Sequence, residues 1–151
     1  MGHIDYVGRP IERTEDLRFL RGRGEYVDDV SVAGQLYAVV LRSSVAHGRI
    51  RSIDTKAALA MPGVHAVITE ADFGAVIPAI PMRLAPLPEL KRFEQPVIAR
   101  GKVRYVGEPI AMVIAASAAA AEDAVDAILV DIEVLPPITN RFEAAKNQSL
   151  L

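Results

Sequence analysis

The apolar and polar positions of residues 36–69 follow short periods that change along the segment. Runs of Val and Leu are typical of buried strands, and strict alternation is typical of a strand with one solvated face. A cap residue before an alanine-rich turn, followed by Pro-Gly, is typical of a short helix. The segment therefore predicts a buried strand over Leu36–Arg42 and a strand with one solvated face over Arg49–Ile53. A helix over Lys56–Met61, capped by Asp54 or Thr55 and ended by Pro62-Gly63, is expected next, and a strand over Val64–Thr69 follows it.

The most informative pattern is the segment from residue 101 to residue 116. A short strand, Val103–Val106, is expected to run into Gly107-Glu108-Pro109. Glycine tolerates positive φ and proline fixes φ near −65° without donating a hydrogen bond, so this tripeptide can turn the chain. The apolar run Ile110–Ala116 that follows predicts either a strand buried on both faces or a hydrophobic helix.

An amphipathic helix and an alternating strand are expected after this run. Over Ala118–Ile128, Ala121, Val125 and Ile128 share one helical face, with acidic side chains opposite. Leu129–Val134 then alternates between aliphatic and acidic residues, and two prolines end it. Residues 129–134 therefore predict a strand with one face toward a core.

Together these elements predict an α+β fold, with a mixed β-sheet of six or seven strands and two main helices. The first helix is too short for a comfortable parallel crossover, which disfavours a doubly wound sheet. A strand over Pro96–Ile98 is also expected. The expected organisation begins with an extended arm at residues 1–34, with a short helix over Glu15–Leu20 capped by Thr14. A core follows at 35–138, in which the proline-rich residues 74–95 predict a long ordered loop or an extended arm. A weakly helical tail at 139–151 is expected to lead toward an absent domain.

Composition limits the classes of function. The chain has 151 residues, of which 51% are hydrophobic, enough for one domain with a core. A net charge of −2 gives no electrostatic case for nucleic acid or an anionic membrane as a partner. The absence of cysteine excludes disulfides, thiolate-bound zinc and an iron–sulfur cluster held by this chain. No apolar run approaches the ~18 residues of a membrane span and the start is too polar for a secretory signal, so a cytoplasmic protein is expected.

Four motifs, in this order, resemble the start of the molybdenum-binding large subunit of the xanthine dehydrogenase, aldehyde oxidase and molybdenum carbon monoxide dehydrogenase family. They are Gly22-Arg-Gly-Glu-Tyr-Val-Asp-Asp29, the segment from Leu36 to Asp54 with Ala57-Ala-Leu-Ala-Met-Pro-Gly-Val64, Tyr105-Val-Gly-Glu-Pro-Ile-Ala111, and the segment from Glu122 to Pro136. The resemblance covers about Arg9 to Leu135. No motif is recognised at residues 75–95, so the substrate type does not carry over.

The resemblance implies an α/β hammerhead fold and a structural, non-catalytic role in an oxidoreductase. Such enzymes hydroxylate N-heterocycles or aldehydes, or oxidise carbon monoxide, at a molybdopterin cofactor, and pass electrons to 2Fe-2S clusters and FAD on other domains or subunits. The implied partners are the molybdopterin-binding remainder of the large subunit and iron–sulfur and flavin subunits. The alternative is a free-standing binding or interaction module that reuses the fold.

No residue is assigned as catalytic, cofactor-binding or metal-binding. Gly22-Arg-Gly24 could cradle a phosphate, but a turn is favoured because the third glycine of a dinucleotide motif is missing. The histidines His3, His47 and His65 have no second ligand at local spacing. Asp28-Asp29 is adjacent in the chain and is typical of a turn, not of an acid–base pair across a cleft.

A basic stretch is the remaining candidate for function. Its six cations are Arg83, Lys91, Arg92, Arg100, Lys102 and Arg104. Against Glu89 and Glu94 they leave a local charge of +4 in a chain that is acidic overall. A solvated loop explains them most simply, and a docking surface is the alternative because apolar residues alternate with the charges. Nucleic-acid binding is disfavoured, since Phe93 and Tyr105 alone offer stacking.

Overall fold

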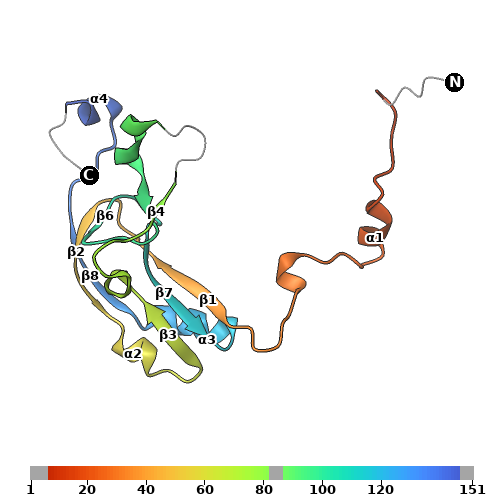
Figure 1. Ribbon diagram of the computed structural model, residues 1–151, viewed down its shortest axis with the longest axis horizontal. Coiled ribbons are helices and arrows are strands. Elements are labelled where there is room, and N and C mark those ends of the chain that lie inside the picture. The colour runs from red at the N-terminus through yellow and green to blue at the C-terminus, as the bar shows by residue number, and fades with distance from the viewer. Residues whose placement is uncertain (1–6, 82–86, 147–151) are drawn as a thin grey trace. The chain divides into compact units, whose positions relative to one another are not determined.

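The computed structural model describes residues 7–81 and 87–146 of the chain. The chain divides into two compact units, residues 1–35 and residues 36–151 (Figure 1). Within the described ranges, no helix has the length and apolar character needed to cross a membrane. The α+β class expected from the sequence is confirmed, as small sheets with few helices.

The first unit contains helix α1 (Asp16–Leu20) and the 3-10 turn η1 (Val27–Asp29). The expectation that Thr14 caps this helix was wrong, since Glu15 occupies the N-cap and makes no side-chain capping hydrogen bond. The Asp29 carboxylate accepts the Tyr26 N–H at 2.9 Å, as expected of a turn at Asp28-Asp29. No residue of either helix is buried.

The second unit is built on a three-stranded sheet in the order β1-β7-β3 (Figure 1). Its strands are β1 (Tyr37–Arg42), β3 (Val64–Ile68) and β7 (Pro109–Ala115). The central strand β7 is antiparallel to both neighbours, and Val113 lies opposite Val39 on one side and Val67 on the other. A central strand covered on both faces explains the unbroken apolar run, whereas β1 is an edge strand with exposed ends and not the buried strand expected.

A second three-stranded sheet has the order β6-β2-β8 and is also antiparallel. It contains β2 (Gly48–Asp54), β6 (Lys102–Val103) and β8 (Leu129–Val134). The single-turn helix α2 (Lys56–Leu59) follows β2, and the Asp54 carboxylate accepts the Lys56 N–H at 3.1 Å. Gly48 lies so close to the Ile132 side chain and the Glu133 carbonyl that no Cβ would fit there.

Helix α3 (Ala118–Asp126) is the longest helix among the described residues and packs on β1 and β7. Ser117 caps it by accepting the Ala120 N–H at 3.1 Å. The helix ends two residues before the expected Ile128, because the chain tightens and turns into β8. The core that α3 covers consists mostly of small side chains: Ala58, Ala111, Val113, Ala115, Ala121, Ala124 and Ile128 are all buried.

The proline-rich segment forms a third, smaller element. A 3-10 turn η2 (Glu70–Phe73) leads to strand β4 (Ala79–Ile80), and a 3-10 helix η3 (Pro88–Phe93) leads to strand β5 (Gln95–Pro96). The two short strands pair with each other and with no other strand in the described ranges. We call the described part of residues 74–97 the lobe.

Two strand predictions were too long. The strand expected over Val103–Val106 ends at Val103, because the Arg104 N–H turns away to the Glu108 carboxylate. The strand expected over Pro96–Ile98 is the pair Gln95–Pro96, after which Ile98 and Ala99 enter the core. The tail carries a single helical turn, α4 (Arg141–Ala144), and its last five residues lie outside the described ranges.

Candidate docking site

The Gly107-Glu108-Pro109 turn is fastened to the end of strand β1. The Gly107 N–H donates to the Ser43 carbonyl at 2.7 Å, and the Ser43 N–H donates to the Glu108 carbonyl at 2.9 Å. The Arg42 guanidinium donates to the Gly107 carbonyl at 2.9 Å. Gly107 has φ +91°, which side chains with a Cβ rarely adopt, so glycine is required at this position. The turn is therefore a fixed feature of the fold.

The buried Glu108 carboxylate also stabilises this turn. Glu108 is 1% exposed, and its carboxylate accepts the backbone N–H of Arg104. The Arg104 guanidinium lies 3.5 Å from Glu108 Oε1 and donates to the Lys102 carbonyl at 3.1 Å. A buried carboxylate is costly unless it is paired and hydrogen-bonded, and here it has both kinds of partner. This arrangement explains a glutamate within an otherwise apolar segment.

The fastened turn presents apolar side chains at its tip. Val106 is 64% exposed and Tyr105 is 36% exposed, although the loop that carries them is hydrogen-bonded to Ser43 and Arg42. The Tyr105 hydroxyl donates to Gln95 Oε1 at 3.4 Å and so connects the turn to strand β5. The lobe and the turn therefore share one surface.

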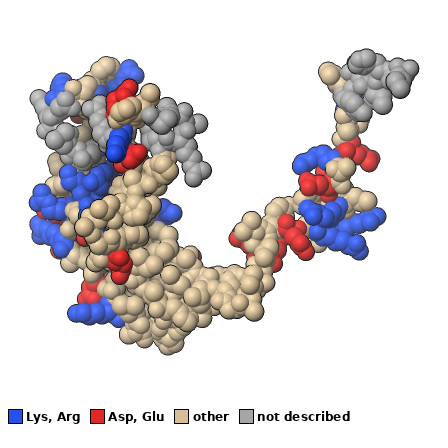
Figure 2. Space-filling model, viewed as in Figure 1, with Lys and Arg blue, Asp and Glu red and all other residues tan. Residues whose placement is uncertain are grey.

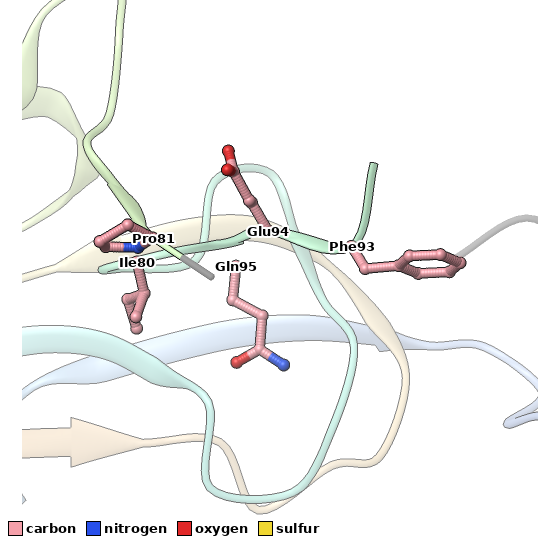
Figure 3. A pocket seen from close by; sticks show the side chains of 5 residues that line it. All are labelled: Ile80, Pro81, Phe93, Glu94 and Gln95. Carbon is pink, nitrogen blue, oxygen red and sulfur yellow. The ribbon is translucent and has the colours of Figure 1, made fainter. Parts of the chain in front are cut away.

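Two adjoining hollows lie on this surface. The larger has a volume of about 400 Å³, and the smaller, of about 200 Å³, is shown in Figure 3. The larger is lined by Phe93, Glu94, Gln95, Pro96, Arg104, Tyr105 and Glu108, and the smaller by Ile80, Pro81, Phe93, Glu94 and Gln95. We call these lining residues, together with Val106, the docking face.

The side chains of Glu94 and Gln95, at the start of β5, point to opposite sides of the chain. In Figure 3, Glu94 projects to one side of the chain, while Gln95 projects to the other side, as does its cross-strand partner Ile80. Phe93 points away from the strand pair and is 56% exposed. The face thus combines aromatic and aliphatic groups with a few charges, the composition of a protein–protein interface.

The four cations of the basic stretch whose side chains are described do not converge on this face. Arg100 is used internally: its guanidinium pairs with the Glu70 carboxylate at 3.0 Å and donates to the carbonyls of Glu70, Gly74 and Ala75. Arg104 pairs with Glu108, and among the described side chains of the stretch it alone lines the larger hollow. Lys91 lies exposed on η3 and Lys102 lies in β6. Arg83 and the side chain of Arg92 lie outside what the structure describes. Figure 2 shows further Lys and Arg atoms on the side where Figure 1 places β2, β6 and β8.

The other candidates of the sequence have local roles. His47 is buried, and its Nδ1 donates to the Pro136 carbonyl at 2.9 Å, while its Nε2 has no partner among the described residues. His65 is exposed on β3, and His3 lies outside the described ranges. Residues 7–81 and 87–146 contain no group of three His, Asp or Glu side chains able to hold a metal ion.

Sequence reasoning missed the residues that shape the docking face. Glu108 was interpreted only as part of a turn, although a glutamate between Gly and Pro at the head of an apolar run indicates a carboxylate that needs a buried partner. The contact of Tyr105 with Gln95 had no local signal, because it depends on how the lobe folds back.

Comparison with known proteins agrees with this fold. Residues 21–136 match the family model described as aldehyde oxidase and xanthine dehydrogenase, a/b hammerhead domain. The chain is 45% identical over 129 residues to the nicotine 6-hydroxylase large subunit of Paenarthrobacter nicotinovorans, covering 85% of this chain and 16% of that protein. It is 43% identical over 138 residues to the carbon monoxide dehydrogenase large chain of Afipia carboxidovorans, covering 91% and 16%.

A solved structure shows the same architecture. Quinoline 2-oxidoreductase from Pseudomonas putida 86 superposes with a TM-score of 0.78 at 38% identity, covering 95% of this chain and 18% of that chain. This chain therefore spans less than a fifth of the length of these relatives. The hammerhead fold expected from the sequence is confirmed, and the chain belongs to the a/b hammerhead domain family of the aldehyde oxidases and xanthine dehydrogenases.

Proposed function

We propose that this chain acts as a structural, non-catalytic domain of a molybdenum hydroxylase and docks through the docking face onto the molybdenum-binding remainder of the large subunit. The observation that carries the proposal is the fastened turn at residues 104–108, which holds exposed Tyr105 and Val106 beside a hollow. A rigid, exposed apolar tip loses little conformational entropy on binding, so it is suited to docking.

The enzyme as a whole would hydroxylate N-heterocycles or aldehydes, or oxidise carbon monoxide. The similarity to a nicotine 6-hydroxylase large subunit and to a carbon monoxide dehydrogenase large chain supports this class. Iron–sulfur and flavin groups would reside on other domains or subunits, with which the large subunit would assemble.

The sequence contains no cysteine, so this chain supplies no thiolate ligand for an iron–sulfur cluster. Among residues 7–81 and 87–146, no three His, Asp or Glu side chains converge as ligands of a metal ion. We propose that the residues of this domain take no direct part in the chemistry. Its contribution would be to support the polypeptide that holds the cofactor.

A reconstitution experiment tests this function. A relative's large chain, such as that of the nicotine 6-hydroxylase, is prepared without the segment that matches this domain, and its affinity for the 151-residue chain is measured. We expect specific binding that Val106→Asp weakens by at least about tenfold, because a charge would be desolvated at the centre of the contact.

Leu129→Asp is the matched control. Leu129 is 68% exposed, close to the 64% of Val106, but it lies at the start of β8 and lines neither hollow. We expect Leu129→Asp to retain the affinity of the unchanged chain. Absence of binding, or equal losses in the two variants, would contradict the proposed docking face and would favour a free-standing module.

A further inference from the structure

The first unit, residues 7–35, carries a second surface that the proposed function does not use. None of its described residues is buried. Its exposed large apolar side chains are Val7, Ile11, Leu17, Leu20, Tyr26, Val27, Val30 and Val32. A folded segment with so much apolar surface and no core of its own is typical of an interaction element.

Three arginines of this unit surround a shallow hollow. The hollow has a volume of about 380 Å³ and is lined by Thr14, Leu17, Arg18, Arg21 and Arg23. Figure 2 shows Lys and Arg atoms gathered at the segment that Figure 1 labels α1. Three guanidinium groups, a hydroxyl and a leucine thus share one small surface.

The arrangement around the hollow is fixed by local packing. The rings of Phe19 and Tyr26 stack with centroids 5.9 Å apart, and the Arg18 guanidinium lies 5.2 Å from the Phe19 centroid. Gly24 fits against the Phe19 ring so closely that a Cβ would clash with it. The chain therefore reverses after α1 in a defined way, which places Arg21 and Arg23 beside Arg18.

Two of the three arginines have no ionic partner among the described residues. The side chains of Arg21 and Arg23 make no hydrogen bond or ion pair with any described residue. Every cation between residues 7 and 35 is arginine, with no lysine. Arginine presents a planar fork of donors that matches a carboxylate in two places, whereas lysine acts as a point charge.

The backbone disfavours a phosphate as the occupant. Phosphate sites of the glycine-rich kind use free backbone N–H groups. Here the Gly22 N–H donates to the Phe19 carbonyl and the Arg23 N–H donates to the Arg18 carbonyl, both at 3.0 Å. The turn expected at Gly22-Arg-Gly24 is therefore present, and the amides of Gly22 and Arg23 are already used within it.

We propose that Thr14, Leu17, Arg18, Arg21 and Arg23 bind a carboxylate-bearing segment of a partner polypeptide, with an aliphatic side chain of that segment against Leu17. Exposed Leu20 and Val27 extend the apolar part of the contact beyond the hollow. The arginines supply specificity for Glu or Asp side chains, and the apolar residues supply contact area.

The test uses the full 151-residue chain and three probes: a short synthetic peptide of alternating Glu and Leu, the same peptide with Gln in place of Glu, and inorganic phosphate. Binding is followed by the NMR signals of the arginine Nε–H groups. We expect the Glu-Leu peptide to shift the signals of Arg18, Arg21 and Arg23 and to bind more tightly than the Gln-Leu peptide. Equal affinity for the two peptides, or a response to phosphate alone, would overturn the proposal.

A matched pair of variants separates this site from general charge attraction. The variant R21Q/R23Q removes two arginines of the hollow, and R49Q/R51Q removes two arginines of β2 that pair with Glu133. We expect R21Q/R23Q to weaken binding of the Glu-Leu peptide by about two- to fivefold per arginine removed. The same loss in R49Q/R51Q would mean that only net charge matters and would contradict the assigned site. The docking-face test involves neither pair, so the two proposals fail independently.

Discussion

The core of the second unit and the lobe at residues 74–97 differ in how they are stabilised. In the core, Ala111, Val113 and Ala115 of β7 have no exposed surface, and α3 covers them with alanines. In the lobe, Val76 is 78% exposed and Phe93 56% exposed, on either side of two-residue strands. The difference indicates that the core depends on its own packing, whereas the described lobe residues leave apolar side chains exposed.

In the part of the lobe that the structure describes, few interactions reach the rest of the unit. A two-stranded ribbon is marginally stable in water, so it needs further contacts. The Arg100 guanidinium donates to the carbonyls of Gly74 and Ala75, and the Tyr105 hydroxyl donates to Gln95 Oε1 at 3.4 Å. Comparable substitutions in the core and in the lobe should therefore change the free energy of unfolding by unequal amounts.

The largest difference is expected for one isoleucine in each region. Ile110 is 2% exposed and Ile80 is 53% exposed. We expect Ile110→Ala to lower the free energy of unfolding by about 2–5 kcal/mol, because it leaves a cavity in the core. Ile80→Ala should change it by less than about 0.5 kcal/mol. Denaturant unfolding of both variants measures this, and similar losses would remove the distinction between core and lobe.

The next largest loss of stability is expected at Gly48, where strands β2 and β8 approach each other closely. A Cβ at this position would overlap the Ile132 side chain and lie 3.0 Å from the Glu133 carbonyl oxygen. We expect Gly48→Ala to cost about 1–3 kcal/mol, as for other overpacked sites. Thermal unfolding checks this prediction. An unchanged midpoint would show that β2 and β8 separate easily.

The buried carboxylate of the turn is expected to matter more than an exposed one. Glu108→Gln keeps the shape of the side chain but directs an amide toward the donors of Arg104, so we expect a loss of about 1–2 kcal/mol. Glu133→Gln, whose carboxylate pairs with Arg49 and Arg51 at the surface, should cost less than about 1 kcal/mol. Equal losses in chemical denaturation would argue against a specific role for Glu108.

The smallest effect on global stability is expected for the arginine that holds the lobe. Arg100→Lys cannot reproduce the fork of donors to three carbonyls and the Glu70 carboxylate. We expect faster amide exchange confined to residues 70–80, with little change in the unfolding midpoint. Arg49→Lys is the control, because Arg49 makes a single exposed ion pair. Unchanged exchange at residues 70–80 would show that Arg100 does not hold the lobe.

The sequence was sufficient for elements whose pattern and packing agree. The unbroken apolar run at β7 left a buried strand or a hydrophobic helix open, and the structure contains the strand. The amphipathic period predicted α3, and Ser117 caps it directly before the expected start at Ala118. The short strands β5 and β6 were misjudged, because their limits depend on distant partners: Val97 bonds to Pro78, and Arg104 bonds to the Glu108 side chain. Local propensity contains no information on such contacts.

The docking face was the least predictable part of the molecule. The sequence directed attention to a basic stretch, whereas the fold uses Arg100 and Arg104 internally and exposes Tyr105 and Val106 instead. Charge counted along the chain does not show which cations find a carboxylate in the folded protein. The exposed apolar tip depends on a turn fastened by residues more than sixty positions apart, such as Arg42 and Gly107.

Amide hydrogen exchange with and without the partner tests the central claim most directly. The 151-residue chain is compared alone and bound to a relative's large chain that lacks the matching segment. We predict that the amides of β7 are protected in both states, and that added protection on binding is concentrated at residues 79–80, 93–97 and 104–107. Added protection elsewhere in residues 36–146, with none at these positions, would contradict a docking role for the lobe and its neighbouring turn.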